Sequence, residues 1–444
     1  MKRFIETLQN IWKIEDLRVR ILNTLGFLLI YRLGSFIVLP GVDPAVLGEV
    51  NQQASGIAAL LNIFAGGAFS RASIFALGIM PYISASIVMQ LAGIAVPSIQ
   101  KMQREGESGR RRLNQWTRIL TIAITAFQAP SYISTQIPAQ AVAGGTTTFW
   151  WIGTIVLLVT GTIFVMWLGE KITDKGIGNG ISMIIMIGII AQLPTSFAFE
   201  WTARLGAGGF VMLLVEMVFL LLITIATVAL VQGTRRIPVN FAKKVVGNKQ
   251  YGGVRQYIPL KVNAAGVMPI IFAQALMFLP ITFVGLTSSD AATGFASAFS
   301  DITGFWYNFI FFILIIAFTY FYTAITVNPN QMAEDLKRNG GFIPGVKPGK
   351  KTSEFLDSVL SRITLPGSIF LGLVAILPAF AMIAGVSTGF AYFFGGTSLL
   401  IMVGVILDTL QQIESHLLMR HYDGLMKSGK IKGRSGSSAF GMAG

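Results

Sequence analysis

The side chains that could do chemistry in this sequence are few, and most of the remainder are apolar. Enzymes that transfer or hydrolyse groups often need a histidine, yet the two histidines are His416 and His421, both near the C-terminus. No H-E-x-x-H zinc motif and no G-x-S-x-G nucleophile turn occurs, and cysteine is absent. The sequence therefore predicts no enzyme, no metal site and no thiol chemistry.

Two glycine-rich stretches resemble phosphate-binding loops only superficially. Residues 345–352 have the wrong spacing, and no strand precedes them, so a turn with Thr352 or Ser353 as the helix N-cap is the better interpretation. Residues 176–180 read Gly-Ile-Gly-Asn-Gly, but they open a membrane span, which disfavours a nucleotide site. No cofactor is expected.

Isoleucines at helical spacing form a more informative pattern. Ile79, Ile83 and Ile87 recur every four residues, which places them on one face of a helix. Such stripes are more often lipid-facing or part of a core than the lining of a pore. Comparable positions in other apolar segments are Ile181, Ile185, Ile271 and Ile401.

A short apolar segment just before this stripe makes the pore interpretation worth keeping. Residues 57–65 reach only about half of a ~30 Å hydrocarbon core, and glycines flank them. Residues 74–96, which follow, are long enough to cross. Backbone that does not span must lie inside protein or in a water-filled cavity. The sequence therefore predicts a re-entrant helix that lies in a cavity.

The composition indicates a polytopic membrane protein. The 444 residues are 53% hydrophobic and 12% charged, and the mean hydropathy is +0.67. Ten segments have about the length that a crossing needs. The predicted spans are 21–39, 74–96, 116–136, 149–168, 181–199, 210–231, 264–286, 305–327, 363–384 and 391–411.

The distribution of positive charge predicts the orientation of these spans. With ten spans, 31 of the 34 lysines and arginines lie on one side of the membrane. The positive-inside rule makes that side, with both termini, cytoplasmic. Residues 1–20 are expected to form an amphipathic helix on the membrane surface, and residues 412–444 a cytoplasmic tail.

A faint internal repeat divides the spans into two halves. Gly-Ile-Met-Pro at residues 78–81 recurs as Gly-Val-Met-Pro at residues 266–269, and the flanking spans share this offset. Because each half has an odd number of spans, the two halves, 21–199 and 210–411, would be inverted. Residues 200–209 would be the hinge. The predicted fold is all-α, with ten transmembrane helices in two inverted five-helix halves.

Two large loops, 232–263 and 328–362, carry much of the cytoplasmic positive charge. Their Pro and Gly turns are expected to hold them in order as they project from the membrane. Basic loops of this kind suit an acidic partner such as RNA, a motor protein or anionic lipid. The basic residues expected to dock it are Arg235, Arg236, Lys243, Lys244, Lys347 and Lys350.

An ion-coupled secondary transporter is the alternative, because inverted repeats are common among transporters. It would need ionisable groups near the membrane midplane. Arg32 and Glu216 fall toward the outer ends of their spans, where snorkelling is cheap, and Asp408 lies near a cytoplasmic end. No proton relay is evident, which favours structural roles for all three.

Several longer motifs resemble one known family, the SecY protein-conducting channels, and its bacterial members closely. The resemblance covers nearly the whole chain. It is most specific at residues 64–87, 105–111, 176–182, 235–240, 259–263, 394–401 and 417–424.

The resemblance implies a channel in the plasma (inner) membrane of a bacterium. Such a channel moves unfolded secretory polypeptides across the membrane and releases hydrophobic segments sideways into lipid. The six isoleucines Ile79, Ile83, Ile181, Ile185, Ile271 and Ile401 would form its pore ring. The short helix would be its plug, with Ile57, Leu60, Leu61, Asn62, Ile63, Phe64, Gly66 and Gly67.

The resemblance also implies a lateral gate and several partners. The partners would be SecE-like and SecG-like small membrane subunits, a SecA motor ATPase, the ribosome, nascent chains and the lipid bilayer. Lys347 departs from the many relatives that carry arginine there, and lysine cannot make the bidentate hydrogen bonds of arginine. The gate residues would be Ile87, Gln90, Gln128 and Gln274.

Overall fold

The computed structural model describes most of the chain, and its described part is mostly helical. The α-helices in the first part of the chain include α2 (Glu15–Gly34), α5 (Met80–Ala95), α6 (Pro97–Arg104), α7 (Glu107–Gln136), α8 (Thr148–Lys175) and α9 (Gly180–Gly206). The described residues are 12, 14–44, 46–47, 62–143, 145–206, 209–241, 244–246, 249–251, 255–284 and 302–427.

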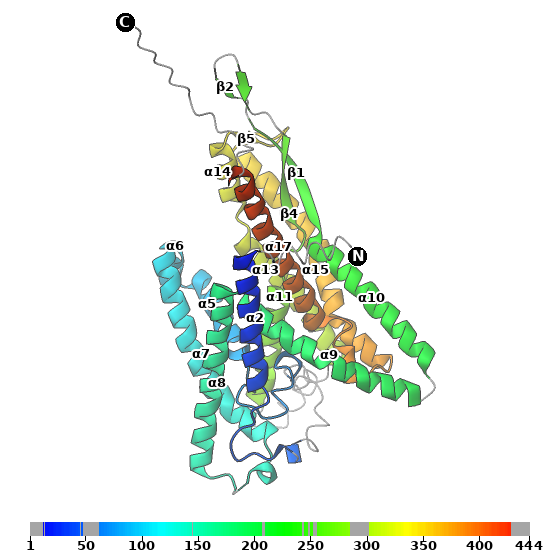
Figure 1. The fold of residues 1–444 in the computed structure, drawn as a ribbon. Coiled ribbons are helices and arrows are strands. Elements are labelled where there is room, and N and C mark those ends of the chain that lie inside the picture. The colour runs from blue at the N-terminus through cyan, green and yellow to red at the C-terminus, as the bar shows by residue number, and fades with distance from the viewer. Residues whose placement is uncertain are drawn as a thin grey trace.

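The second part of the chain adds further helices and a small sheet region. Figure 1 shows α5 to α8 on one side of the molecule and most of the later helices on the other, with α9 running between the two groups. The later helices are α10 (Phe210–Gln232), α11 (Met268–Val284), α13 (Phe305–Thr326), α14 (Pro329–Arg338), α15 (Lys350–Ile383), α16 (Thr388–Ala391) and α17 (Gly396–Lys427).

Helices occupy all ten positions where the sequence predicts a span. Six helices of the described part are long and apolar enough to cross a membrane, and a bent helix pair would make a seventh. The chain is therefore a multi-pass, mainly helical membrane protein, whereas the count of ten crossings stays a prediction.

The bent pair corrects the predicted second span. Residues 74–79 form turns rather than helix, and α5 begins at Met80, after Gly78 with φ +53°. α5 then ends at a bend of 102° into α6. Val96 at the bend is extended, with φ −109° and ψ 113°, because a residue before proline avoids the helical region.

Two helix ends correct the boundaries of the predicted domains in the first half. α2 begins at Glu15, so residues 15–20 belong to the first long helix and not to a separate surface helix. Glu15 and Asp16 stabilise this start, since acidic side chains favour a helix N-terminus. α9 runs to Gly206, so most of the predicted hinge is helical.

Two more corrections fall in the second half. α15 begins at Lys350, well inside the predicted loop 328–362, and α17 continues through the start of the predicted tail to Lys427. Gly349 is the N-cap of α15, with φ +99°. The expected cap Thr352 instead donates its hydroxyl to the Lys347 carbonyl oxygen at 2.9 Å.

The basic loops contain strands that the sequence analysis does not predict. β1 (Thr234–Phe241) pairs antiparallel with β4 (Arg255–Lys261), and β5 (Gly341–Phe342) pairs with the other edge of β1. The two large loops are thereby joined into one body at one end of the molecule (Figure 1). A short hairpin of β2 (Lys244–Val246) and β3 (Lys249–Tyr251) extends from it.

Candidate channel interior and docking surface

The six predicted ring isoleucines all belong to, or pack against, one large apolar cluster. Four are buried, with exposed fractions of 4% for Ile79, 8% for Ile83, 4% for Ile185 and 3% for Ile401. Ile181 and Ile271 are half-buried and pack against the same cluster, which takes in helices of both halves. The six positions therefore belong to one apolar interior that is much larger than a single ring, and the ring assignment stays a prediction.

Glycines place several of these isoleucines at the beginnings of helices. Gly78 and Gly266 both have positive φ, +53° and +64°, and a helix starts two residues after each. The two Gly-x-Met-Pro motifs of the repeat thus adopt the same local conformation, which a side chain at either glycine would strain. This turn sets Ile79 and Ile271 in or next to the first turn of α5 and α11.

The described part of the predicted plug is buried against α9. Residues 62–64 are helical, residues 65–72 form turns, and the exposed fractions of Ile63 and Phe64 are both 5%. A Cβ at Gly188 of α9 would overlap the Phe64 carbonyl oxygen, so glycine allows the close approach. Ile57, Leu60 and Leu61 lie outside the described residues.

Side chains from neighbouring elements satisfy the polar backbone of this turn. The Gly66 carbonyl oxygen accepts hydrogen bonds from Arg32 Nη1 at 2.9 Å and Arg71 Nη2 at 3.0 Å. Asn62 Oδ1 accepts the Ser70 backbone N–H at 3.1 Å, and Gly67 has φ +85°. Irregular backbone at this position is therefore tolerated because protein groups replace water.

The structure corrects two expectations about ionisable residues. Arg32 does not simply snorkel to the surface, because it bonds to Gly66 and lies 5.3 Å from the Phe36 ring centroid. Glu216 does not snorkel either. Its side chain is 4% exposed and pairs with Arg204 at 2.6 Å.

The predicted gate residues do not form one polar cluster. Ile87 is buried, and Gln90 bonds within α5 to Ser86 at 3.4 Å. Gln128 is half-buried, and no hydrogen bond joins it to Gln90 or Gln274 in the described part of the chain. The gate assignment stays a prediction.

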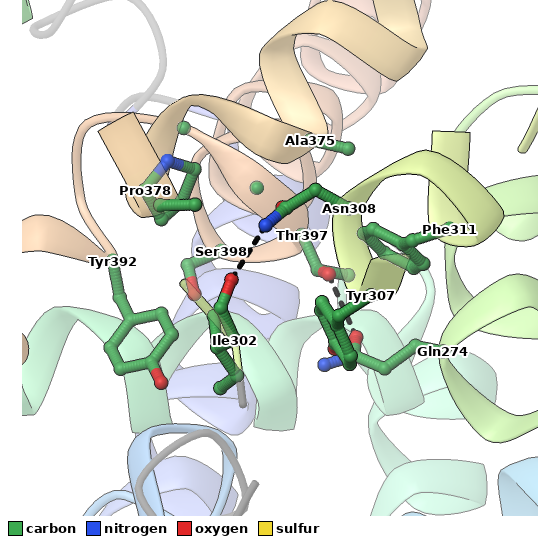
Figure 2. A pocket seen from close by; sticks show the side chains of 13 residues that line it. Gln274, Ile302, Tyr307, Asn308, Phe311, Ala375, Pro378, Tyr392, Thr397 and Ser398 are labelled. Carbon is green, nitrogen blue, oxygen red and sulfur yellow. Dashed lines mark hydrogen bonds between the residues drawn. The ribbon is translucent and has the colours of Figure 1, made fainter. Parts of the chain in front are cut away.

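Gln274 instead faces a small cavity inside the second half. Its Oε1 accepts the Thr397 hydroxyl at 2.7 Å, as Figure 2 shows, beside Asn308, Tyr307 and Ser398. The cavity volume is about 30 Å³, room for about one or two water molecules. The lining is mostly apolar, and its few polar side chains include those of Gln274, Asn308 and Thr397.

Five of the six basic residues predicted to dock a partner lie on or beside the strand-containing body. Arg235 and Arg236 are exposed on β1, opposite Leu260 and Pro259 of β4. Lys347 and Lys350 are exposed where α15 begins, Lys244 begins β2, and Lys243 lies outside the described residues. Beneath them is an apolar core of Ile237, Val239, Leu260, Leu336, Ile343, Leu356 and Leu360.

Sequence reasoning missed two polar groups of the interior. The first is the pair Arg32 and Arg71, which converge on one carbonyl and which nothing in their spacing predicts. The second is the ion cluster of Glu200, Arg204 and Glu216. The spacing of Glu200 and Arg204, four residues apart, is the signal that could have identified part of that cluster.

Comparison with known proteins identifies the family of this chain. A sequence model of the SecY family matches residues 73–410. The chain is 43% identical over 445 residues to "Protein translocase subunit SecY" from Thermus thermophilus, covering 98% of this chain and 100% of the relative. The chain belongs to the SecY family.

Solved channel structures share the fold of this SecY family member. One, described as "The structure of a protein conducting channel", has a TM-score of 0.61 at 16% identity and covers 90% of this chain and 92% of its own. Another, "Sec61 in the Canine ribosome-channel complex from the endoplasmic reticulum", has a TM-score of 0.58 at 16% identity, with the same coverage of both chains. At this identity the likeness concerns the fold.

Proposed function

We propose that this chain is a protein-conducting channel, the pore-forming subunit of a protein translocase. It moves unfolded secretory polypeptides across the membrane and releases hydrophobic segments sideways into lipid. The observation that carries the proposal is an apolar cluster shared by both halves of a SecY family member. The six isoleucines belong to it or pack against it, and Ile63 and Phe64 of the buried turn belong to it as well. No feature of the described residues favours the ion-coupled transporter.

An apolar ring suits a substrate that presents every side chain in turn. Specific hydrogen bonds would hold some sequences and reject others, whereas isoleucine side chains seal around any of them. In the resting state the same surface resists wetting and blocks ions. The turn at residues 62–67 would then close the path as a plug.

Sideways release follows from the energetics of membrane insertion. About ten leucines at roughly −0.5 kcal/mol each favour lipid by about 5 kcal/mol, while one central charge costs about 3 kcal/mol. A gate between the two halves would expose each segment to lipid, and this difference in free energy would decide whether the segment leaves the channel. We assign that gate to α5 and α7 facing α11 and α13, with Ile87, Gln90, Gln128 and Gln274.

The proposal extends to location and partners. We place the chain in the plasma membrane of a bacterium with both termini in the cytoplasm, because its basic loops cluster on one side. The work of translocation comes from a SecA-like motor or the ribosome, bound at the basic body that carries Arg235 and Lys347. A SecE-like subunit braces the two halves, and a SecG-like subunit is a further small membrane partner. We assign no catalytic step to this chain.

Reconstitution tests the function directly. Purified complex in proteoliposomes, supplied with a SecA-type motor and ATP, is expected to protect a secretory preprotein from added protease. Uptake of a small solute driven by an ion gradient, without protection of the preprotein, would instead support a transporter.

Reversing charge on the basic body is expected to weaken partner binding. Arg235→Glu, Arg236→Glu and Lys347→Glu should each weaken motor or ribosome binding roughly tenfold, because each replaces an attraction of about 1 kcal/mol by a repulsion. The spans should stay folded, since these side chains are exposed outside the long apolar helices. Binding is measured with purified complex, and Lys427→Glu at the end of α17 is the control. Unchanged binding in all three variants would contradict the assignment.

A further inference from the structure

Two contacts define a seam between α11 and α17. A Cβ at Gly404 of α17 would lie 3.1 Å from Cγ2 of Val267, the residue just before α11, so these two residues are close neighbours. At the other end of the seam, Thr397 of α17 donates its hydroxyl to Gln274 Oε1 of α11 at 2.7 Å. Because residue 267 is next to residue 404 and residue 274 is next to residue 397, the two helices run antiparallel.

Ile271 and Ile401, two of the predicted ring isoleucines, lie inside this seam. Ile271 follows Val267 by four residues and precedes Gln274 by three, a spacing that keeps all three on one helix face. The same spacing joins Ile401 to the two contact residues of α17. The close approach at one end of the seam and the hydrogen bond at the other end therefore flank the two isoleucines.

The hydrogen bond lies at a place where side chains do not fill the space between the helices. The cavity of about 30 Å³ adjoins Gln274 and Thr397 (Figure 2), and its other walls come mainly from α13 and α15. In the described part of the chain α11 packs extensively against α13, whereas its contacts with α17 are few. The position of α11 at this end of the seam therefore depends on the Gln274–Thr397 hydrogen bond more than on close packing.

The α17 side of this hydrogen bond has a firm base. Thr397 is 4% exposed and lies in the first turn of α17. Just before it, a Cβ at Gly395 would overlap the Val374 carbonyl oxygen of α15, so the beginning of α17 lies directly on α15. Glycine allows this approach because it has no side chain. The hydrogen bond thus ties α11 to a fixed point of the second half.

We propose that Gln274 and Thr397 are positioning residues that hold α11 at the distance from α17 at which Ile271 and Ile401 close the pore. Apolar side chains exclude water only while they touch, so a small displacement of α11 admits water. The hydrogen bond resists this displacement, because breaking it leaves a polar group without a partner in the interior. In this role both residues act through the two isoleucines and not by contact with the polypeptide. This inference rests on the proposed channel function.

The test measures resting ion flux into liposomes that contain the purified complex, without substrate or motor. Thr397→Val removes the hydroxyl and keeps the side-chain shape, and Gln274→Met removes the amide and keeps the length. We expect each variant to raise the flux about fivefold, while Thr397→Ser, which keeps the hydroxyl, stays at the wild-type level. The double variant Thr397→Val/Gln274→Met should leak no more than the single variants, because both changes remove one shared bond.

The matched control is Thr227→Val on α10. Thr227 is also fully buried, but its hydroxyl donates to the Ile223 carbonyl oxygen of its own helix at 2.8 Å. The same loss of a buried hydroxyl therefore leaves the seam between α11 and α17 intact, and the flux should stay at the wild-type level. Thermal stability is measured for every variant, since a merely structural role would lower stability without changing the flux.

Unchanged flux in both Thr397→Val and Gln274→Met would overturn the proposal, as would an equal leak in Thr397→Ser or Thr227→Val. A double variant whose increase is the product of the two single increases would show that the two residues act independently. If neither single variant accumulates in the membrane, the bond serves assembly alone and the proposal fails.

Ion flux needs no transported substrate, so the positioning role and the channel function fail separately. If the wild-type complex transports no preprotein but the variants leak as expected, the channel function fails and the positioning role stands. If transport occurs and the variants do not leak, the positioning role alone fails.

Discussion

Replacing Ile83 with asparagine is expected to raise the resting ion conductance of the purified complex in planar bilayers by roughly tenfold. Ile83 is 8% exposed, within the apolar cluster that contains the other ring positions. An amide there hydrogen-bonds to water and lowers the barrier to wetting by about 1–2 kcal/mol. Ile401→Asn should behave in the same way, because Ile401 reaches the cluster from the other half.

Two controls separate a ring from an ordinary core. Ile83→Val keeps the surface apolar and should leave conductance unchanged, at a stability cost of about 0.5–1.5 kcal/mol. Leu221→Asn, on the exposed face of α10, should lower abundance without opening a path. Asparagine variants at Ile83 and Ile401 that are destabilised but electrically silent would refute the ring.

Replacing Gly188 with alanine is expected to unseat the re-entrant turn and raise ion leak by about tenfold. Its new Cβ would overlap the Phe64 carbonyl oxygen, and backbone cannot yield as a flexible side chain does. Overpacking of this kind costs about 1–3 kcal/mol, which is enough to shift a closed plug toward an open one. Ion flux into liposomes that contain the purified complex is the measurement.

Gly153→Ala on α8 is the matched control for this substitution. It is also a helical glycine, but a Cβ there meets no atom within 4 Å. Its leak should equal that of the wild type, and its thermal stability should rise slightly, since alanine favours helix. If the Gly188→Ala complex leaks no more ions than the wild type and has normal stability, the turn at residues 62–67 does not seal the path.

The sequence predicts the helices better than it predicts their ends. Apolar length locates a helix at every expected span, because the membrane imposes that length on any crossing segment. Apolar length carries no information about where a helix continues into water. The i, i+4 pair of Glu200 with Arg204 extends α9 to Gly206, and α15 begins at Lys350 on a glycine cap.

The sequence also predicts only part of the candidate site. The isoleucine positions follow from spacing and resemblance, and the structure gathers them into one cluster. The bonds from Arg32 and Arg71 to Gly66 depend on backbone carbonyls that only a folded turn presents. The strands of the basic loops were missed because β1 pairs with β4 across residues 242–254 and with β5 from the other large loop.

Cross-linking of an arrested substrate tests the path of the polypeptide most directly. A photoreactive amino acid is placed at Ile83 or Ile401, and at Leu221 as the lipid-facing control, and a preprotein is stalled halfway through the reconstituted complex. We expect covalent adducts with the preprotein at Ile83 and Ile401 and none at Leu221. A stalled, protease-protected preprotein that forms no adduct at either isoleucine would contradict the account, because the polypeptide would then cross by another route.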